Sequence, residues 1–228
     1  INAGGGGVNR NVIINGAMNV AQRRTSASSI GNETVFILDR FLTTQGSSDG
    51  RFTMSQDSSA PSGFANSLKL DCTTADTSVA AGEFLILRQT VEAQNCQQFA
   101  KGTSDAKPFA VSFYVKGNAS ATYVCELLAD DVSRQISQTF SVTTDWTRVE
   151  LTFPADTTGV INDDNGAGLY LNIWLHAGST YAGGTLNTTW NSLTQANRAV
   201  GISSFFDSTD RTFFITGVQL EVGQNPTE

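Results

Sequence analysis

The amino-acid sequence predicts an all-β protein, an antiparallel β-sandwich of the jelly-roll type. The first observation is composition: only 15% of the 228 residues are charged, whereas 22 Ser, 27 Thr and 16 Asn provide a neutral polar surface. The second observation is pattern, because short runs of alternating apolar and polar residues are separated by clusters of Gly, Asn, Asp and Ser. The third is that no long segment shows the 3.6-residue period of a helix. About eleven strands at this spacing are typical of a sandwich or jelly roll.

The alternating runs give the expected strands in chain order. They are Asn11–Ile14, Thr34–Leu42, Arg51–Gln56, Ser67–Thr73, Glu83–Glu92, Pro108–Lys116, Thr122–Leu128, Arg134–Val142, Trp146–Phe153, Gly168–His176 and Arg211–Val222. One helical turn is expected at Ala93–Phe99. Residues 1–9, with four consecutive glycines, lack any period and are expected to form a flexible lead-in. No linker-like segment interrupts residues 10–228, so these are expected to form a single domain.

Alternation also predicts which side chains face the core, because successive residues of a strand point to opposite faces. In one strand the inward set is expected to be Phe109, Val111, Phe113 and Val115. In another the inward set is expected to be Leu169, Leu171, Ile173 and Leu175. The outward set of that second strand is the unusual one: Tyr170, Asn172, Trp174 and His176.

Charge and hydropathy exclude several classes of protein. The net charge of −7, with only four lysines, opposes a phosphate backbone, so we expect no nucleic-acid binding. No stretch approaches the roughly 18 apolar residues that span a bilayer, so no membrane insertion is expected. The chain has no signal peptide and begins at Ile1, which suggests a mature product or an excised portion.

The cysteines give no sign of a metal site or a disulfide framework. Cys72, Cys96 and Cys125 are an odd number without a CxxC pair, and His176 is the single histidine that could join them as a ligand. We expect free thiols, with Cys72 and Cys125 as small core residues, and assembly in a reducing cytosol.

Catalytic motifs are also missing, so the chain is not expected to be an enzyme. It has no G-x-S-x-G sequence and no histidine pair for a metal. The acidic pairs Asp130-Asp131 and Asp163-Asp164 are interpreted as turn residues, although a glycosidase would need two carboxylates. Asp163, Asp164 and Asn165 are weak calcium candidates, because the loop fails the EF-hand spacing and an ordinary Asx/Gly turn explains it.

The outward face of Gly168–His176 is the candidate binding site. Flat aromatic rings pack against sugar rings while amides bind hydroxyls, so Tyr170, Asn172, Trp174 and His176 on an exposed concave sheet would form a carbohydrate platform. The alternative is that these side chains pack under a long loop or against another subunit. Three further residues could cover the same face, add stacking surface or lie on the same sheet: Tyr181, Trp190 and Tyr114, the last with Lys116.

Several segments carry recognisable motifs. They are NVIINGAMNVAQR from Asn11 with LDRF from Leu38, LRQTVE from Leu87 with FAVSFYVK from Phe109, WTRVELTF from Trp146, and FITGVQLEVG from Phe214. The first and last resemble the start and the end of a domain common in virion and tail-fibre proteins of tailed bacteriophages. The middle segments resemble the core of carbohydrate-binding-module jelly rolls. The resemblance covers Asn9 to Glu228.

This resemblance implies a carbohydrate-binding-module-like jelly roll in a non-enzymatic virion protein, either of a tail fibre or of a fibre or decoration on the head surface. It implies a trimer or multiple display, assembly in the bacterial host cytoplasm, and contacts with other virion proteins and with host surface glycans. The alternatives are a purely architectural module that mediates subunit contacts and, third, a polysaccharide depolymerase. Many such jelly rolls hold a structural calcium through an Asp on the last strand, but Thr216-Gly217 stands there, so no cofactor is expected.

Overall fold

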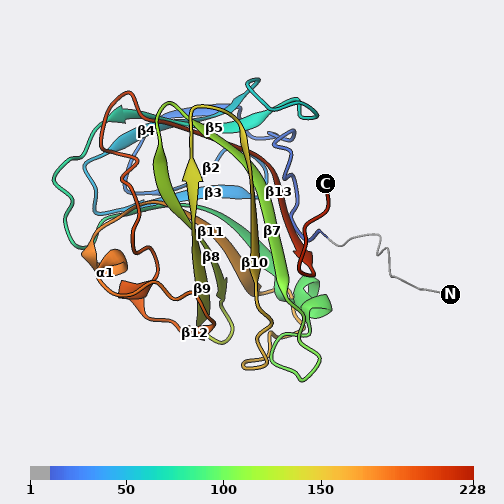
Figure 1. Cartoon of the computed structure of the whole chain (residues 1–228). Coiled ribbons are helices and arrows are strands. Elements are labelled where there is room, and N and C mark those ends of the chain that lie inside the picture. The colour runs from blue at the N-terminus through green and yellow to red at the C-terminus, as the bar shows by residue number, and fades with distance from the viewer. Residues whose placement is uncertain (1–10) are drawn as a thin grey trace.

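Two antiparallel sheets pack face to face in a computed structural model of the chain, which describes residues 11–228 (Figure 1). The expected all-β sandwich of jelly-roll type is therefore confirmed. The lead-in expected at residues 1–9 lies outside the described residues. Within 11–228, no helix is long and apolar enough to cross a membrane.

The six-stranded sheet forms one layer of the sandwich. Its strands, in spatial order, are β1 (Ser26–Ile30), β4 (Arg51–Asp57), β5 (Ser67–Thr74), β13 (Thr212–Val222), β7 (Phe109–Gly117) and β10 (Thr147–Phe153). The seven-stranded sheet forms the other layer. Its order is β12 (Asn191–Ser192), β9 (Arg134–Val142), β8 (Ala121–Ala129), β11 (Ala167–Ala177), β6 (Phe84–Glu92), β3 (Phe41–Gly46) and β2 (Thr34–Phe36). Three short helices complete the described chain: the 3₁₀ helices η1 (Ala93–Phe99) and η2 (Gln195–Asn197), and α1 (Ser179–Ala182).

Most expected strands agree with the structure to within one residue at each end, and the helical turn at Ala93–Phe99 is confirmed as η1. The expected strand Thr34–Leu42 is wrong, because the chain turns after Phe36 and Arg40 takes a positive φ of 73° before β3 begins. The expected strand Asn11–Ile14 is also wrong: it contributes one isolated bridge, from Asn11 to Glu221. β1 and β12 were not expected from the sequence, since neither shows apolar alternation.

The inner faces of the two sheets form one apolar core, as the alternation predicts. The expected inward sets of β7 and β11 are all buried there: Phe109, Val111, Phe113, Val115, Leu169, Leu171, Ile173 and Leu175. Cys72, Cys96 and Cys125 are buried as well, which confirms the interpretation of Cys72 and Cys125 as core residues. Aromatic pairs reinforce the core, for example Phe99 and Phe109, whose ring centroids are 4.2 Å apart.

The segment 11–18 lies along β13 and joins the two ends of the described chain. The N–H of Val12 donates to the carbonyl of Leu220 at 2.9 Å, and the N–H of Val218 donates to the carbonyl of Gly16 at 3.0 Å. We call this contact the terminal seam. It brings the first and the last of the motifs that carry the family resemblance against one another.

The other motif residues join the same seam. Gln89 on β6 binds Ile14 twice: its Oε1 accepts from the Ile14 N–H at 2.8 Å, and its Nε2 donates to the Ile14 carbonyl at 3.0 Å. Asn15 Nδ2 donates to the carbonyl of Asp39 at 3.0 Å. These motif residues therefore hold the fold together, which gives them a structural role independent of any ligand.

Candidate functional site

The outer face of the seven-stranded sheet carries most of the residues that the sequence singles out. Tyr170, Asn172 and Trp174 of β11 point away from the main core, as alternation predicts, and Trp174 belongs to a separate apolar cluster with Ile86 and Val124. Whether these side chains can contact a ligand depends on the segment that follows β11.

Residues 178–206, which we call the strap, fold back over this face. Tyr181 of α1 packs its ring 5.3 Å from that of Trp174. The strap is also held by backbone hydrogen bonds, from Ser137 N–H to the carbonyl of Asn187 at 2.7 Å and from Phe205 N–H to the carbonyl of Leu175 at 2.8 Å. The strap therefore covers one half of the outer face, on the β8 and β11 side.

The expected exposed platform is corrected by this burial. Asn172, Trp174 and His176 have no exposed surface, because the strap lies over them. A ring without exposed surface cannot stack on a sugar, so the alternative weighed from the sequence, packing under a long loop, describes these three residues. Tyr181 takes the covering role, and of the β11 set Tyr170 alone keeps exposed surface.

Beneath the strap, the buried Glu126 of β8 gathers four hydrogen bonds. Its carboxylate accepts from Asn172 Nδ2 at 2.8 Å and from Trp174 Nε1 at 2.9 Å. Arg198 of the strap supplies the other two, both at 2.8 Å, and its Cζ lies 4.7 Å from the centroid of the Trp174 ring. Because a buried carboxylate needs such partners, Glu126 is a structural anchor for the strap.

His176 fastens the far end of the strap. Its Nε2 lies 2.9 Å from Oε2 of Glu83, and its Nδ1 lies 2.8 Å from Oγ of Ser204 in the strap. The order of groups is that of a serine-histidine-carboxylate triad, but the histidine and glutamate side chains are 0% and 4% exposed. Ser204 Oγ also accepts from the Phe206 N–H at 3.0 Å. The arrangement therefore holds the loop around Ser204 against the sheet through a histidine and a carboxylate that are both buried.

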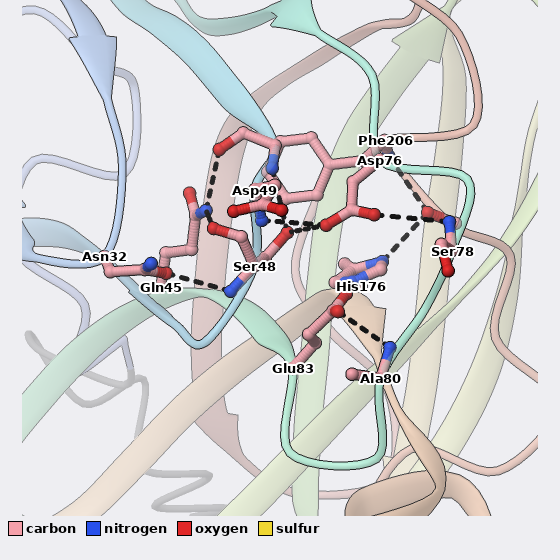
Figure 2. A network of polar contacts seen from close by, with 12 residues as sticks. Asn32, Gln45, Ser48, Asp49, Asp76, Ser78, Ala80, Glu83, His176 and Phe206 are labelled. Atoms are coloured by element: carbon pink, nitrogen blue, oxygen red, sulfur yellow. Dashed lines mark hydrogen bonds and ion pairs between the residues drawn. The ribbon is translucent and has the colours of Figure 1, made fainter.

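A second buried carboxylate lies beside this histidine, as Figure 2 shows. Asp76 accepts hydrogen bonds from Ser48 Oγ and from the Asp49 N–H, both at 2.8 Å. Burial opposes ionisation of Asp76, but these bonds and one from the Ser78 N–H outweigh it, so the pKa of the carboxyl is lowered. This network ties the loops 46–50, 75–83 and 204–206 together at one end of the sandwich.

Trp190 lies away from the expected face. Its indole Nε1 donates to the carbonyl of Pro154 at 2.8 Å, and its ring packs 5.6 Å from Phe109 of the main core. The ammonium of the buried Lys101 lies 5.1 Å from the same ring and 2.9 Å from Asp156. Trp190 therefore closes the edge of the sandwich and is no part of a sugar platform.

Tyr114 also lies elsewhere, since β7 belongs to the six-stranded sheet. The expectation that Tyr114 and Lys116 share a sheet with Tyr170 is wrong: strand order sets this, and alternation within a strand carries no information on strand order. The acidic pairs Asp130-Asp131 and Asp163-Asp164 are exposed and lie outside the strands, in keeping with their interpretation as turn residues.

The calcium candidates lie together in an exposed turn. Asp163, Asp164 and Asn165 are exposed, and Asp164 Oδ1 accepts from the Gly166 N–H at 2.8 Å in an ordinary Asx turn. Across residues 11–228, no group of three or more His, Cys, Asp and Glu side chains is placed to hold a metal. On the last strand, Thr216 Oγ1 donates to the carbonyl of Asn66 at 2.7 Å, so that position supplies no carboxylate.

The other half of the outer face, over β6, β3 and β2, lies beside the strap, whose Tyr181 and Arg198 line one end of it. Two adjacent pockets of about 280 and 220 Å³ follow it. We call them together the open groove; its side chains from these three strands are Phe36, Leu42, Thr44, Phe84, Ile86, Arg88, Thr90 and Glu92. Phe36 is 40% exposed. The groove thus combines an exposed ring with hydroxyl and guanidinium donors.

Arg88 and Tyr170 connect the groove to the buried half. The Arg88 guanidinium carbon lies 4.2 Å from the centroid of the Tyr170 ring, and Arg88 Nε donates to Asn172 Oδ1 at 2.7 Å. Tyr170 Oη donates to Asp130 Oδ2 at 3.1 Å. Burial lowers the pKa of Arg88 and raises the pKa of Tyr170. The contacts of Arg88 and Tyr170 thus fix their positions beside each other, and Arg88 also lines the groove.

Of the groove residues, Arg88 and Thr90 could have been found from the sequence, because alternation in Glu83–Glu92 places them on one face. The sequence did not indicate that Phe36 lies at the edge of a sheet, because its segment was expected to be part of one longer strand, Thr34–Leu42. Its place at the sheet edge follows from the pairing of β2 with β3.

The chain matches no protein-family model, and no curated protein matches it. Three solved structures of similar fold illustrate what the sandwich is similar to. The enzymatically active domain of tailspike protein 4 from bacteriophage CBA120 has a TM-score of 0.46 and 12% identity over 93% of this chain. This chain spans about a fifth of the tailspike chain, 21%.

Two carbohydrate-binding modules are similar over most of both chains. The family 11 module from Clostridium thermocellum has a TM-score of 0.41 and 9% identity, covering 90% of this chain and 99% of that one. A family 30 module has a TM-score of 0.42 and 11% identity, covering 89% and 90%. Similarities at this level concern the arrangement of strands and carry no information on ligand or activity.

Proposed function

We propose that the chain is a non-enzymatic glycan-binding module of a bacteriophage virion protein, and that it binds sugar in the open groove. The observation that carries the binding part is the groove itself: two pockets along the sheet, with the exposed ring of Phe36 at one end and Arg88 beside the strap at the other. Aromatic faces and multidentate donors are the groups that recognise sugar rings and hydroxyls.

The virion part of the proposal is supported by the first and last motifs, from Asn11 and from Phe214, which resemble the start and the end of a domain of tail-fibre and virion proteins. In such a particle the module would be displayed in several copies beside other virion proteins. Many weak sites then bind a cell by avidity, which exceeds a single affinity by roughly 10²–10⁴ without new contacts.

The proposal that the chain binds sugar without cleaving it rests on the carboxylates near the groove. Glu92 pairs with Arg40 at 3.3 Å, and Asp130 accepts from the Tyr170 hydroxyl. Among the residues that line the groove, Glu92 alone is acidic, whereas glycoside hydrolysis requires two carboxylates.

The test is binding of the purified chain to surface polysaccharide of the host, measured by affinity electrophoresis and calorimetry. Phe36→Ala is expected to weaken binding about tenfold, equivalent to about 1.4 kcal/mol. Val160→Ala is the matched control, because Val160 is 57% exposed but lies in the loop after β10. No reducing ends are expected to appear in the polysaccharide.

Three outcomes would overturn the proposal. Unchanged affinity in Phe36→Ala would remove the open groove as the site. Release of reducing ends would make the chain a depolymerase. An absence of binding by the wild type, together with stable association of the chain with itself or with other virion proteins, would make it an architectural module.

A further inference from the structure

A row of cationic and aromatic side chains crosses the outer face of the six-stranded sheet, on the opposite side of the molecule from the open groove. Phe214 of β13 pairs in register with Lys69 of β5 on one side and with Lys116 of β7 on the other. The two ammonium nitrogens lie 5.7 and 5.5 Å from the centroid of the Phe214 ring. Trp146 extends the row, its ring 6.1 Å from that of Phe214. All four side chains keep some exposed surface.

A pocket of about 380 Å³ lies beside this row. Tyr114 and Arg148, paired in register on β7 and β10, line it, and the ring of Phe64 packs 5.4 Å from that of Tyr114. Gly217 makes room for the two rings: it has a φ of +63°, and a Cβ there would lie 2.7 Å from Phe64 Cζ. The break in pairing between Thr216 and Gln219 thus places aromatic surface on this face.

The positive charge of the row is only partly neutralised by the protein. Lys69 pairs with Asp71 at 3.2 Å, and Arg148 pairs with Glu150 at 2.8 Å. Among the ion pairs of residues 11–228, none involves Lys116. In a chain with a net charge of −7 and four lysines, two of those lysines flank one aromatic ring. A contact with a ring leaves the ammonium charge in place, so the row attracts anions.

We propose that this row is a second binding site, for an acidic polysaccharide whose sugar rings lie on Phe214 and Trp146 and whose carboxylates pair with Lys116 and Lys69. A protein partner fits less well, because lysine is depleted in protein interfaces, whereas here it stands at the centre. A flexible anionic polymer can bind a lysine that remains solvated. The aromatic rings of the row match the apolar faces of the polymer's sugar rings, and the lysines match its carboxylates. The site is independent of the open groove in position and in charge.

The experiment titrates the full chain with polygalacturonic acid and with its fully methyl-esterified form, which removes the charge and keeps the polymer. The wild type is expected to bind the acid form alone, with an affinity that falls as salt rises. Lys116→Gln is expected to weaken binding at least tenfold. Lys107→Gln, which removes an exposed lysine from the 100–108 loop, is the matched control and is expected to bind as the wild type does.

Phe36→Ala separates the two sites. It is expected to leave binding of the acid polymer unchanged, whereas loss of that binding would assign the polymer to the open groove and overturn this proposal. Equal binding of the methyl ester, or equal weakening by Lys107→Gln, would also overturn it. So would self-association of the chain that Lys116→Gln abolishes, because the row would then be a subunit contact. None of these outcomes depends on whether the open groove binds sugar, so they test the second site even if the proposal for the open groove fails.

Discussion

Arg198 and Glu126 form a two-pronged ion pair in which Nε and Nη2 of the guanidinium donate to the two carboxylate oxygens, both at 2.8 Å. Both side chains are buried, at 9% and 0% exposure. The pair connects the strap to the middle of the seven-stranded sheet, so the covered half of the outer face is fastened by charge as well as by apolar contact.

Breaking this pair is expected to be strongly destabilising. Arg198→Met leaves the Glu126 charge buried without its main partner, which should lower the free energy of unfolding by about 3–5 kcal/mol. Arg40→Met is the control, because its pair with Glu92 is more than one third exposed on both sides and should contribute far less to stability. Urea unfolding of both variants measures the difference; a loss below 1 kcal/mol in Arg198→Met would contradict the anchoring role.

Acid should weaken the edge of the sandwich through Asp156. Burial raises the pKa of this carboxyl, but hydrogen bonds from Arg134 and Lys101 outweigh it, so the folded pKa is lowered. The unfolded value is about 3.9, so the carboxylate stabilises the fold above that pH, and the contribution is lost as pH falls toward the folded pKa.

Asp156→Asn tests this pH dependence. The variant should be less stable than the wild type by a constant amount above about pH 5, and the difference should shrink as pH falls below about 4. Asp163→Asn, in an exposed turn, should follow the wild type throughout. Urea unfolding from pH 3 to pH 7 measures both; a difference that stays constant down to pH 3 would show that the Asp156 pKa is not lowered.

The thiols should be unreactive in the folded protein. Burial raises the pKa of Cys72 to about 11 and of Cys96 to about 12, and it raises the pKa of Cys125 further. Because the thiolate is the reactive species, Ellman's reagent at pH 8 should label all three thiols only after unfolding. Rapid labelling of any one in native buffer would mean that its segment opens locally.

Gly16 should not tolerate a side chain. A Cβ at this position would lie 2.0 Å from the carbonyl oxygen of Val218, which the terminal seam holds in place. Gly16→Ala is therefore expected to lower the free energy of unfolding by about 1–3 kcal/mol. Gly82→Ala, whose Cβ would approach nothing closer than Ser47 Oγ at 3.9 Å, should be within about 0.5 kcal/mol of the wild type. Equal stability of the two variants would contradict the seam.

The fold could be predicted from the sequence because its signals are local. Alternation in segments such as Arg134–Val142 depends on one strand with one buried face, and that strand was placed with both ends correct. β1 and β12 could not be predicted in this way, since they exist through pairing with distant strands and bury little apolar surface.

The site was harder to predict for a related reason. Alternation correctly placed Trp174 on the outer side of β11, but whether that side is exposed to solvent depends on the strap. The strap itself shows no regular spacing of apolar residues from which its position could be predicted. The same limit applies to Tyr114, which alternation pointed outward and strand order placed on the other sheet. Orientation is a property of one strand, whereas exposure is a property of the assembled molecule.

The terminal seam has a consequence for reading related sequences. Three of its motif residues, Gly16, Gln89 and Val218, close the scaffold and lie outside the open groove. Other residues of the same motifs lie on the proposed ligand surfaces: Arg88 lines the open groove, and Phe214 stands at the centre of the cation–aromatic row. Within LRQTVE the two roles alternate along one strand, since Gln89 binds the terminal seam from one face while Arg88 faces the groove from the other. Two chains that share this signature would therefore be expected to share the frame, and a substitution at an outward-facing motif position would change the surface without changing the seam.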